Sequence, residues 1–357
     1  MIQVTKTYLP SFDEYTAQLK RAWDKGWITN HGELVLELEQ TLKKYLGVKH
    51  LFFCNNGTTV LQMALKALDI KKEVITTPFS YVATTTAILW ENCTPVFVDI
   101  NDQDYNVDAA KIEAAITPNT EAILVTHVYG NPCNVEKIEA IAKKHNLKVI
   151  YDGAHAFGVN YKNKSLLSYG DIATCSFHAT KLFHTVEGGA IITDNDEIAN
   201  KLMLFRQFGH VYDDYYSVGI NGKNSEFHAA MGLTVFPKLP ELIEKRKILT
   251  NLYNQNLLPL GLIRPQPLTD TVYNYSYYPI VFSSEALLLN VKNKLAQNEI
   301  NTRRYFYPSL NELPYITQKY DCPISEDISR RVLCLPLYPD LETETVAKIC
   351  SVIKTNL

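Results

Sequence analysis

The chain has 357 residues, of which 46% are hydrophobic and 20% charged, with a net charge of −3 and a pI of about 6.3. This composition is typical of a globular protein, and the length predicts two domains. The weak negative charge gives no basic field for nucleic acid or anionic lipid. The seven cysteines are scattered and include no CxxC pair, which favours reduced thiols over a disulfide framework or a zinc site.

The start of the chain lacks the charged-then-apolar order of a signal peptide, and no apolar run approaches the ~20 residues that cross a bilayer. We therefore expect a cytoplasmic protein. Two amphipathic segments, near 12–25 and 33–46, predict an N-terminal helical arm.

From about residue 50 to 195, short β-branched runs alternate with helical patterns. Strands are expected at 51–54, 73–76, 95–100, 121–126, 147–152, 171–177 and 189–193, and helices at 58–68, 109–115 and 135–144. This alternation predicts an α/β fold with a mainly parallel sheet, helices on both faces and a ligand at the carboxyl ends of the strands.

The pattern changes after about residue 240. A charged helix is expected over 239–256, then a proline-rich stretch, a strand over 272–282 and a helix over 285–298. We therefore expect an N-terminal arm and large domain over 1–240, followed by a smaller C-terminal α/β domain over 241–357.

Two loops in the first half could hold a flat, phosphorylated ligand. Asn55-Asn56-Gly57-Thr58-Thr59 lies between an expected strand and a helix, where free N–H groups beside a glycine and two hydroxyls could bind phosphate. An ordinary helix N-cap is the alternative. Thr77-Pro78-Phe79-Ser80-Tyr81 follows the next strand and offers two aromatics, one of which could stack on a planar ring or simply fill the core.

Asp152 and Lys181 are the pair that pyridoxal phosphate chemistry needs. Asp152 follows Val149-Ile150-Tyr151 at the expected carboxyl end of a strand, where a buried carboxylate requires a cationic or hydrogen-bonded partner. Lys181 lies between an inner strand and the Glu187-Gly188-Gly189 turn, which argues against a merely solvated lysine. An aspartate can keep a pyridine nitrogen protonated, and a lysine amine can bond the cofactor aldehyde.

Two neighbours of this pair are further candidates. His155 could contact the ring hydroxyl, with a satisfied core histidine as an equal alternative, and Ser176 could reach the phosphate. The nine histidines all lie before residue 229 and show no convergent ligand spacing, so no metal site is predicted.

Read in order, these motifs resemble the DegT-type nucleotide-sugar aminotransferases. The resemblance runs from Gly26-Trp27-x-Thr29-Asn30-x-Gly32 through Gly219-x-Asn221-x-Lys223-x-Ser225-Glu226 to Leu335-Pro336-Leu337-Tyr338-Pro339. It implies the type I, aspartate aminotransferase-like fold, with a mixed but mostly parallel seven-stranded sheet in the large domain and a smaller C-terminal α/β domain.

The resemblance also implies roles for the matching residues. Lys181 and Asp152 would be catalytic, and Asn221 would reach the phosphate of the neighbouring subunit's cofactor, which implies a homodimer with shared active sites. The implied cofactor-binding residues are Gly57, Thr58, Tyr81, Asp152, His155, Ser176, Lys181 and Asn221.

Within the family, Ser176-Phe177-His178-Ala179-Thr180-Lys181 and His127-Val128-Tyr129-Gly130-Asn131-Pro132-Cys133 are closest to the subgroup that forms dTDP-4-amino-4,6-dideoxyglucose. The resemblance implies that L-glutamate aminates the C4 ketone of dTDP-4-keto-6-deoxyglucose for lipopolysaccharide O-antigen synthesis, with pyridoxamine phosphate as the cofactor form in the second half-reaction. Candidates to hold the nucleotide diphosphate are Lys223, Arg303, Arg304, Tyr305 and Tyr307, for each of which a solvated surface loop is the alternative.

Three other functions stay open. The enzyme could act at C3, or on a UDP- or GDP-linked ketosugar. It could be a non-catalytic regulator on the same fold, which the intact Lys181, Asp152 and Asn221 disfavour. It could also be an amino-acid aminotransferase, although no arginine stands out as a clamp for an α-carboxylate. The family's dehydratases have histidine in place of the lysine, so Lys181 argues against that reaction.

Overall fold

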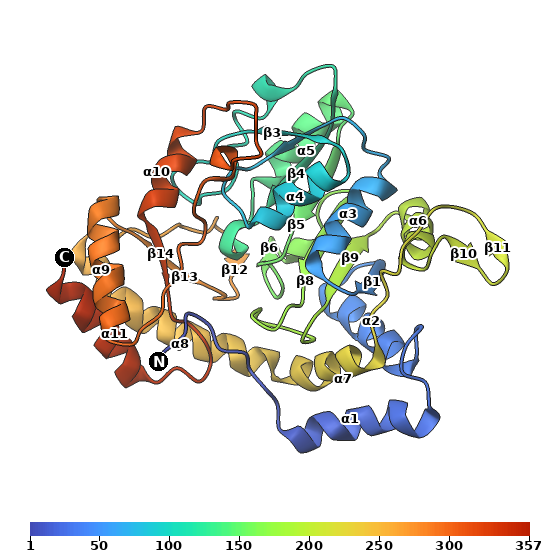
Figure 1. Cartoon of the computed structure of the whole chain (residues 1–357), viewed down its shortest axis with the longest axis horizontal. Coiled ribbons are helices and arrows are strands. Elements are labelled where there is room, and N and C mark those ends of the chain that lie inside the picture. The colour runs from blue at the N-terminus through green and yellow to red at the C-terminus, as the bar shows by residue number, and fades with distance from the viewer.

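The computed structural model describes residues 1–357 and places a seven-stranded sheet at the centre of the molecule (Figure 1). The strand order is β1-β9-β8-β5-β4-β2-β3. Their bounds are β1 His50–Cys54, β2 Glu73–Thr76, β3 Thr94–Phe97, β4 Thr120–Thr126, β5 Lys148–Asp152, β8 Ile172–Ser176 and β9 Gly189–Thr193. Only β9 runs antiparallel to its neighbours, and the other adjacent pairs are parallel. The predicted mixed, mostly parallel seven-stranded sheet is confirmed.

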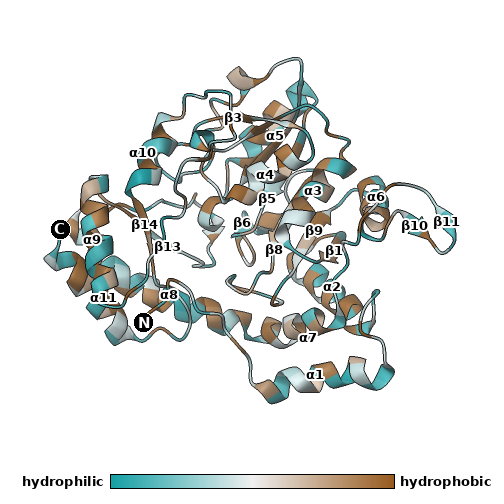
Figure 2. Cartoon of the chain, in the orientation of Figure 1, coloured by the Kyte–Doolittle hydropathy of each residue, from teal (hydrophilic) through white to brown (hydrophobic).

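Helices cover both faces of this sheet. They are α2 (Glu33–Leu46), α3 (Gly57–Ala67), α4 (Val82–Trp90), α5 (Val135–His145), α6 (Asp196–Arg206) and α7 (Glu226–Val235). Successive residues of β4 enter different cores: Ile123 packs in the cluster that includes α2, α5 and α7, whereas Leu124 packs in the cluster of α3, α4 and α6. The central strands are accordingly hydrophobic (Figure 2), as expected where a sheet is buried on both faces.

The N-terminal helix α1 (Phe12–Lys25) packs along α7 (Figure 1). It starts at a capping box formed by Ser11 and Glu14 and ends at Gly26, whose φ of 62° is the left-handed conformation that favours glycine. The first residues instead reach the C-terminal part of the chain, because Ile2 pairs with Ile300.

The C-terminal part has a core of its own. It comprises α8 (Leu239–Leu257), β13 (Tyr278–Val281), α9 (Glu285–Gln297), α10 (Pro323–Arg331), β14 (Val332–Leu335) and α11 (Thr343–Thr355). Strands β13 and β14 are antiparallel, and a cluster of 20 buried residues between Leu249 and Ile353 surrounds them. The domain boundary near residue 240 stays a prediction, with α8 beginning at the residue before it.

Some predicted elements differ from the observed ones. The helix expected over 109–115 is only a 3-10 turn at Glu113–Ala115, a short segment cut off by the Thr-Pro pair that follows. The strand expected over 272–282 is divided into β12 (Thr271–Val272) and β13. Helix α4 was not expected, because its three consecutive threonines have low helix propensity, and here its burial against the sheet decides.

The remaining strands are short. β6 (Asn160–Tyr161), β7 (Lys164–Ser165) and β12 form a small sheet, and β10 (His210–Val211) with β11 (Asp214–Tyr215) forms a hairpin that projects from the body (Figure 1). No helix has both the length and the apolar composition to span a membrane.

Candidate active site

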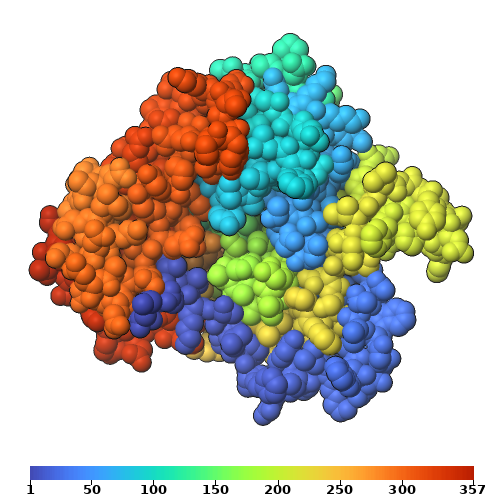
Figure 3. All heavy atoms as spheres, viewed as in Figure 1, coloured from blue at the N-terminus to red at the C-terminus, as the bar shows by residue number.

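The loops that follow four strands meet at one pocket of about 420 Å³, a size suited to a small-molecule ligand. The strands are β1, β2, β5 and β8, and they supply Asn56, Gly57, Thr58, Ser80, Tyr81, Asp152, Ala154, His155, Ser176, His178, Thr180 and Lys181. The opposite wall comes from the C-terminal part through Tyr277, Arg303, Tyr305 and Phe306. In Figure 3 the yellow-green residues around 180 lie between the orange C-terminal residues and the blue and cyan residues of the first half.

A chain of hydroxyls holds Asp152, which is 5% exposed. Its Oδ2 accepts a hydrogen bond from Thr84 Oγ1 at 2.7 Å, and its Oδ1 accepts one from the backbone N–H of Ala154 at 3.0 Å. Because the Thr84 proton is used on the carboxylate, Ser80 donates to Thr84 at 2.8 Å and accepts from Thr126 at 2.8 Å. The carboxylate is thereby fixed at the pocket wall and has acceptor capacity left for a cationic N–H.

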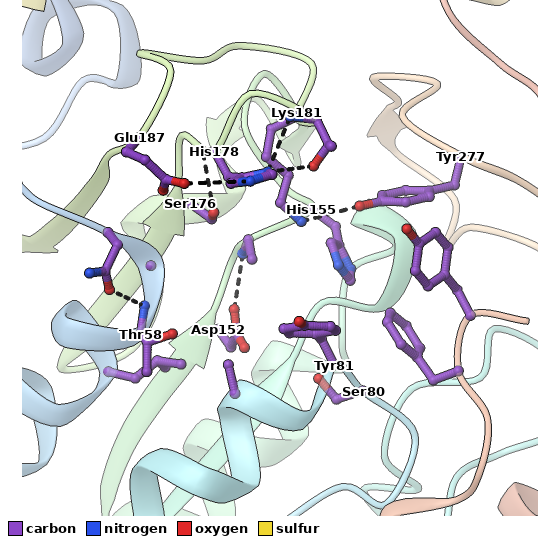
Figure 4. Close-up of a pocket in the computed structure, with 18 of the residues that line it drawn as sticks. Thr58, Ser80, Tyr81, Asp152, His155, Ser176, His178, Lys181, Glu187 and Tyr277 are labelled. Carbon is purple, nitrogen blue, oxygen red and sulfur yellow. Dashed lines mark hydrogen bonds and ion pairs between the residues drawn. The ribbon is translucent and has the colours of Figure 1, made fainter. Parts of the chain in front are cut away.

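The Lys181 amine points into the same pocket (Figure 4). Its Nζ donates a hydrogen bond to Tyr277 Oη at 3.2 Å. Burial acts to lower the pKa of Lys181, but the electrostatic interaction and hydrogen bond with Tyr277, together with Asp152, outweigh it and raise that pKa. The free amine is therefore protonated near neutral pH and must lose a proton before it acts as a nucleophile or base.

His155 contributes a single defined donor. Its Nδ1 accepts a hydrogen bond from the backbone N–H of Tyr129 at 3.2 Å, which places the ring proton on Nε2. The imidazole stacks on Phe306 with the ring centroids 5.6 Å apart. Burial, and secondly the charge of Lys181, lower the pKa of His155 well below its ordinary value, so the ring stays neutral. His155 is thus a satisfied core residue at Nδ1 and a donor at Nε2.

The N-terminus of α3 forms a narrow cradle beside the end of β8. Asn56 Oδ1 accepts from the backbone N–H groups of Thr58 and Thr59 at 3.0 and 2.8 Å, so the N-cap interpretation is correct for those two groups. The N–H of Gly57 and the hydroxyl of Thr58 keep no partner within the protein. A Cβ on Gly57 would lie 2.8 Å from Ser176 Cβ, so only glycine permits this approach. An anion can therefore be held by one helix N–H and by hydroxyls on both sides.

Tyr81 and the His178–Glu187 pair stand at the edge of the pocket (Figure 4). The Tyr81 side chain is 55% exposed although it lines the pocket, which leaves a ring face free to stack. His178 Nε2 lies 3.6 Å from Glu187 Oε1.

The structure separates the substrate-binding candidates. Arg303 and Tyr305 line the pocket, whereas Arg304 and Tyr307 do not. The Arg304 guanidinium donates to Glu285 at 2.6 Å and to the carbonyl of Arg330 at 2.9 Å, and it lies 3.4 Å from the centroid of the Tyr307 ring. Both Arg304 and Tyr307 are thus engaged within the C-terminal part.

Lys223 and Asn221 also lie outside the walls of this pocket. Lys223 Nζ is 4.8 Å from the centroid of the Phe208 ring, and burial, followed by the charge of Arg206, lowers its pKa. Asn221 is exposed and follows the projecting β10–β11 hairpin. In one chain, neither side chain contributes to the pocket that contains Lys181.

Sequence reasoning missed Tyr277, Phe306 and the role of Thr84. Tyr277 lies within the stretch expected to be one strand, and no spacing links it to Lys181, 96 residues earlier. Thr84 belongs to the loop-and-helix motif that begins at Thr77, but its contact with Asp152 depends on the packing of α4. The one signal in the sequence is that Tyr277 is an aromatic residue close to the C-terminal strands, and this does not identify Lys181 as its partner.

Pyridoxal phosphate fits this set of groups. Asp152 can accept from a pyridinium N–H, the Nε2–H of His155 can donate to a ring oxygen, and the Gly57 cradle can take the phosphate. The Lys181 amine faces the same space, as bonding to an aldehyde would require.

Comparison with known proteins agrees with this chemistry. Residues 12–354 match the DegT/DnrJ/EryC1/StrS aminotransferase family. The dTDP-4-amino-4,6-dideoxy-D-glucose transaminases of Escherichia coli and Shigella dysenteriae are 42% and 39% identical to the chain, and each match covers 99% of this chain and 98% of the relative. GDP-perosamine synthase of Escherichia coli O157:H7 is 33% identical, with 92% of each chain covered. The crystal structure of DesI in the presence of its TDP-sugar product has a TM-score of 0.94 at 31% identity, and covers 99% of this chain and 92% of that one.

Proposed function

The chain belongs to the DegT/DnrJ/EryC1/StrS aminotransferase family, and we propose that it uses pyridoxal phosphate to transfer the amino group of L-glutamate to the C4 ketone of dTDP-4-keto-6-deoxy-D-glucose. The products are dTDP-4-amino-4,6-dideoxy-D-glucose and 2-oxoglutarate, with O-antigen synthesis as the destination of the sugar. The observation that carries this choice of sugar is the full-length similarity, at about 40% identity, to two transaminases named for that product.

The side chains of the pocket divide the work. When bound, the cofactor supplies an aldehyde that bonds the substrate nitrogen and a ring that accepts electrons as the α-proton leaves. Asp152, fixed by Thr84 and Ala154, keeps the ring nitrogen protonated. Lys181 Nζ would take the proton from the α-carbon of the donor and would then deliver it to C4′, the cofactor carbon bonded to the same nitrogen. Tyr81 would cover one face of the cofactor ring and reduce the access of water to that face.

Arg303 supports binding of both anionic substrates. It is the one arginine that lines the pocket, it is exposed, and its guanidinium makes no ion pair or hydrogen bond within the protein. Its nearest ring is that of Tyr305, whose centroid lies 5.2 Å from the guanidinium carbon. A planar guanidinium can hold a carboxylate of glutamate in one half-reaction and the nucleotide diphosphate in the other.

The active unit in this proposal is a homodimer with shared sites. Tyr212 and Tyr215 of the β10–β11 hairpin are 90 and 78% exposed, and Val218 just after it is 92% exposed, an apolar surface that a second copy would cover. Asn221 follows this hairpin, outside the pocket of its own chain, and would complete the phosphate site of the partner. Lys223 would accompany it toward the same substrate.

Mixing two inactive variants tests the shared site. Lys181→Ala and Asn221→Ala dimers should each be weakly active or inactive, whereas exchanged hybrids contain one site with both native residues. About a quarter of all sites should regain activity if exchange is statistical. Absence of recovery, with hybrids verified by mass spectrometry, would remove Asn221 from the partner's site.

The visible spectrum of the purified enzyme tests the reaction itself. We expect an absorption band of bound cofactor that fades with L-glutamate and returns with dTDP-4-keto-6-deoxyglucose. A band that fades without returning would keep the aminotransferase and discard the sugar. Absence of a band after pyridoxal phosphate is added would refute the cofactor assignment. Lys181→Ala is the control that should lose both responses.

A second candidate has specific support, because the relative from Escherichia coli O157:H7 is named for a GDP-linked product. The same spectral recovery, measured with GDP- and UDP-linked ketosugars, ranks the nucleotides. Identification of the aminated carbon in the product then separates C4 from C3.

A further inference from the structure

We propose that Tyr277 is a positioning residue for this reaction: its phenol holds the Lys181 amine whenever that amine is not bonded to the cofactor. The proposal rests on the proposed function, since it assigns a task within the same site. It concerns a side chain from the C-terminal part that no sequence motif marks.

The contact between the two side chains is direct. Lys181 Nζ lies 3.2 Å from Tyr277 Oη, and this is the only side-chain hydrogen bond of the lysine within the chain. Figure 4 shows the phenol and the amine facing each other across the pocket. Since both residues line the pocket, their hydrogen bond lies in the space where the substrate would react.

The ring of Tyr277 is held by aromatic contacts. It meets the His155 imidazole edge-on with centroids 4.9 Å apart, and the Tyr305 ring at 5.9 Å with an interplanar angle of 87°. These contacts involve the ring and not the hydroxyl. Phenylalanine at position 277 would therefore keep the packing and lose only the hydrogen bond.

The backbone that carries Tyr277 is fixed from two sides. Asn274 is fully buried, and its Nδ2 donates to the carbonyls of His155 and Phe157 at 2.9 Å each, while its Oδ1 accepts from the N–H of Ser276 at 3.1 Å. Arg246 of α8 donates to the carbonyl of Ser276 at 3.2 Å. These bonds hold the backbone of Tyr277 beside the loop that carries His155. The phenol oxygen is therefore positioned before substrate binds.

This placement restricts the conformations of the Lys181 side chain during turnover. A released lysine side chain has several rotatable bonds and would sample many positions, but it must take a proton from one carbon and deliver it to another nearby. If the neutral amine donates one N–H to Tyr277 Oη, its lone pair stays free for the α-proton. The ammonium that results keeps the same hydrogen bond, now strengthened by charge, until it gives the proton up. The raised pKa of Lys181 agrees with such a partner, because the interaction with Tyr277 is the main influence opposing burial.

Tyr277→Phe tests the proposal, with Tyr273→Phe as the matched control. Tyr273 precedes Tyr277 in the same segment, and its hydroxyl donates to the carbonyl of Tyr129 at 2.7 Å without lining the pocket. The first readout uses cofactor-free protein, in which trace acetylation of Lys181 against pH gives the pKa of that amine. The second is the single-turnover rate of the glutamate half-reaction against pH. Thermal unfolding of each variant reports folding.

We expect Tyr277→Phe to lower the pKa of Lys181, to move the acid limb of the half-reaction to lower pH, and to slow the half-reaction roughly 10- to 100-fold. Tyr273→Phe should leave the Lys181 titration unchanged. An unchanged Lys181 pKa and rate in Tyr277→Phe would overturn the role, and so would equal shifts in both variants, which would mark a general structural effect. A wild-type protein that binds no cofactor would instead overturn the proposed function, and this role with it.

Discussion

Arg303 and Arg304 are adjacent in sequence, and the structure predicts opposite consequences for their removal. Arg303 lines the pocket and makes no side-chain hydrogen bond or ion pair, whereas the Arg304 side chain is 11% exposed and donates to Glu285 and to the carbonyl of Arg330. Arg303→Ala should therefore weaken substrate binding and leave the fold intact. Arg304→Ala should destabilise the C-terminal part and affect substrate binding much less.

The sizes of both effects follow from the contacts. A hydrogen bond to a charged group contributes about 1.5–3 kcal/mol, and because Arg303 is solvent-exposed we take the lower part, about 1.5–2 kcal/mol. That corresponds to an increase of ~10- to 30-fold in KM for the nucleotide sugar. For Arg304, loss of the Glu285 and Arg330 bonds should lower the free energy of unfolding by about 2 kcal/mol.

Steady-state kinetics with each substrate varied in turn, and urea unfolding of both variants, provide the assay. If Arg303 binds both anions, KM should rise for glutamate as well as for the sugar, and a rise for one alone identifies its partner. The reasoning is refuted if Arg304→Ala raises KM for the sugar more than Arg303→Ala does while unfolding like the wild type.

Three further predictions concern the cradle, a buried ion pair and acid stability. Gly57→Ala should weaken binding of pyridoxal phosphate about tenfold or more in a fluorescence titration. The new Cβ forces α3 away from Ser176 at a cost of about 1–3 kcal/mol. An affinity equal to that of the wild type would show that the cradle at Gly57 does not bind the phosphate. Arg206→Met should cost about 3–5 kcal/mol in urea unfolding, since it leaves the Glu39 carboxylate buried without its cation, and a loss below ~1 kcal/mol would contradict this. Burial lowers the pKa of His127 to about 3, whereas the pKa in the unfolded chain is about 6.5. Between these two pH values the unfolded chain binds one more proton than the folded chain, so the free energy of unfolding decreases as the pH falls. His127→Gln should flatten this slope by up to about 1.36 kcal/mol per pH unit, and identical slopes would refute the assignment.

The positions of Asp152, Ser176 and Gly57 were predictable for one physical reason. Each follows or ends a hydrophobic run that predicts a buried strand, and the carboxyl ends of parallel strands meet at one edge of a sheet. Local pattern alone was enough to bring the three groups together. The boundaries of the strands were less certain, because fraying ends carry little pattern of their own.

His155 shows where this reasoning stops. Its neighbourhood in the sequence identified it as a ring-contact candidate, but its role required knowing which nitrogen was already used. The backbone N–H of Tyr129, 26 residues away, occupies Nδ1 and leaves Nε2–H as the donor. Tautomer and protonation follow from such distant contacts and from burial, which no local pattern records.

The sequence by itself determined the sheet. It also indicated the Asp152–Lys181 pair and the loops that could hold a phosphate as candidates, because these signals depend on periodicity and on residue type at strand ends. Only the tertiary structure decided which distant side chains meet them. Arg303 pairs with Cys334 in an extended segment, and consecutive side chains of such a segment point to opposite sides. The Arg303 side chain therefore lies in the pocket, whereas that of Arg304 contacts α9 and α10. The contact of Tyr277 with Lys181 likewise exists because the C-terminal part folds back over the sheet.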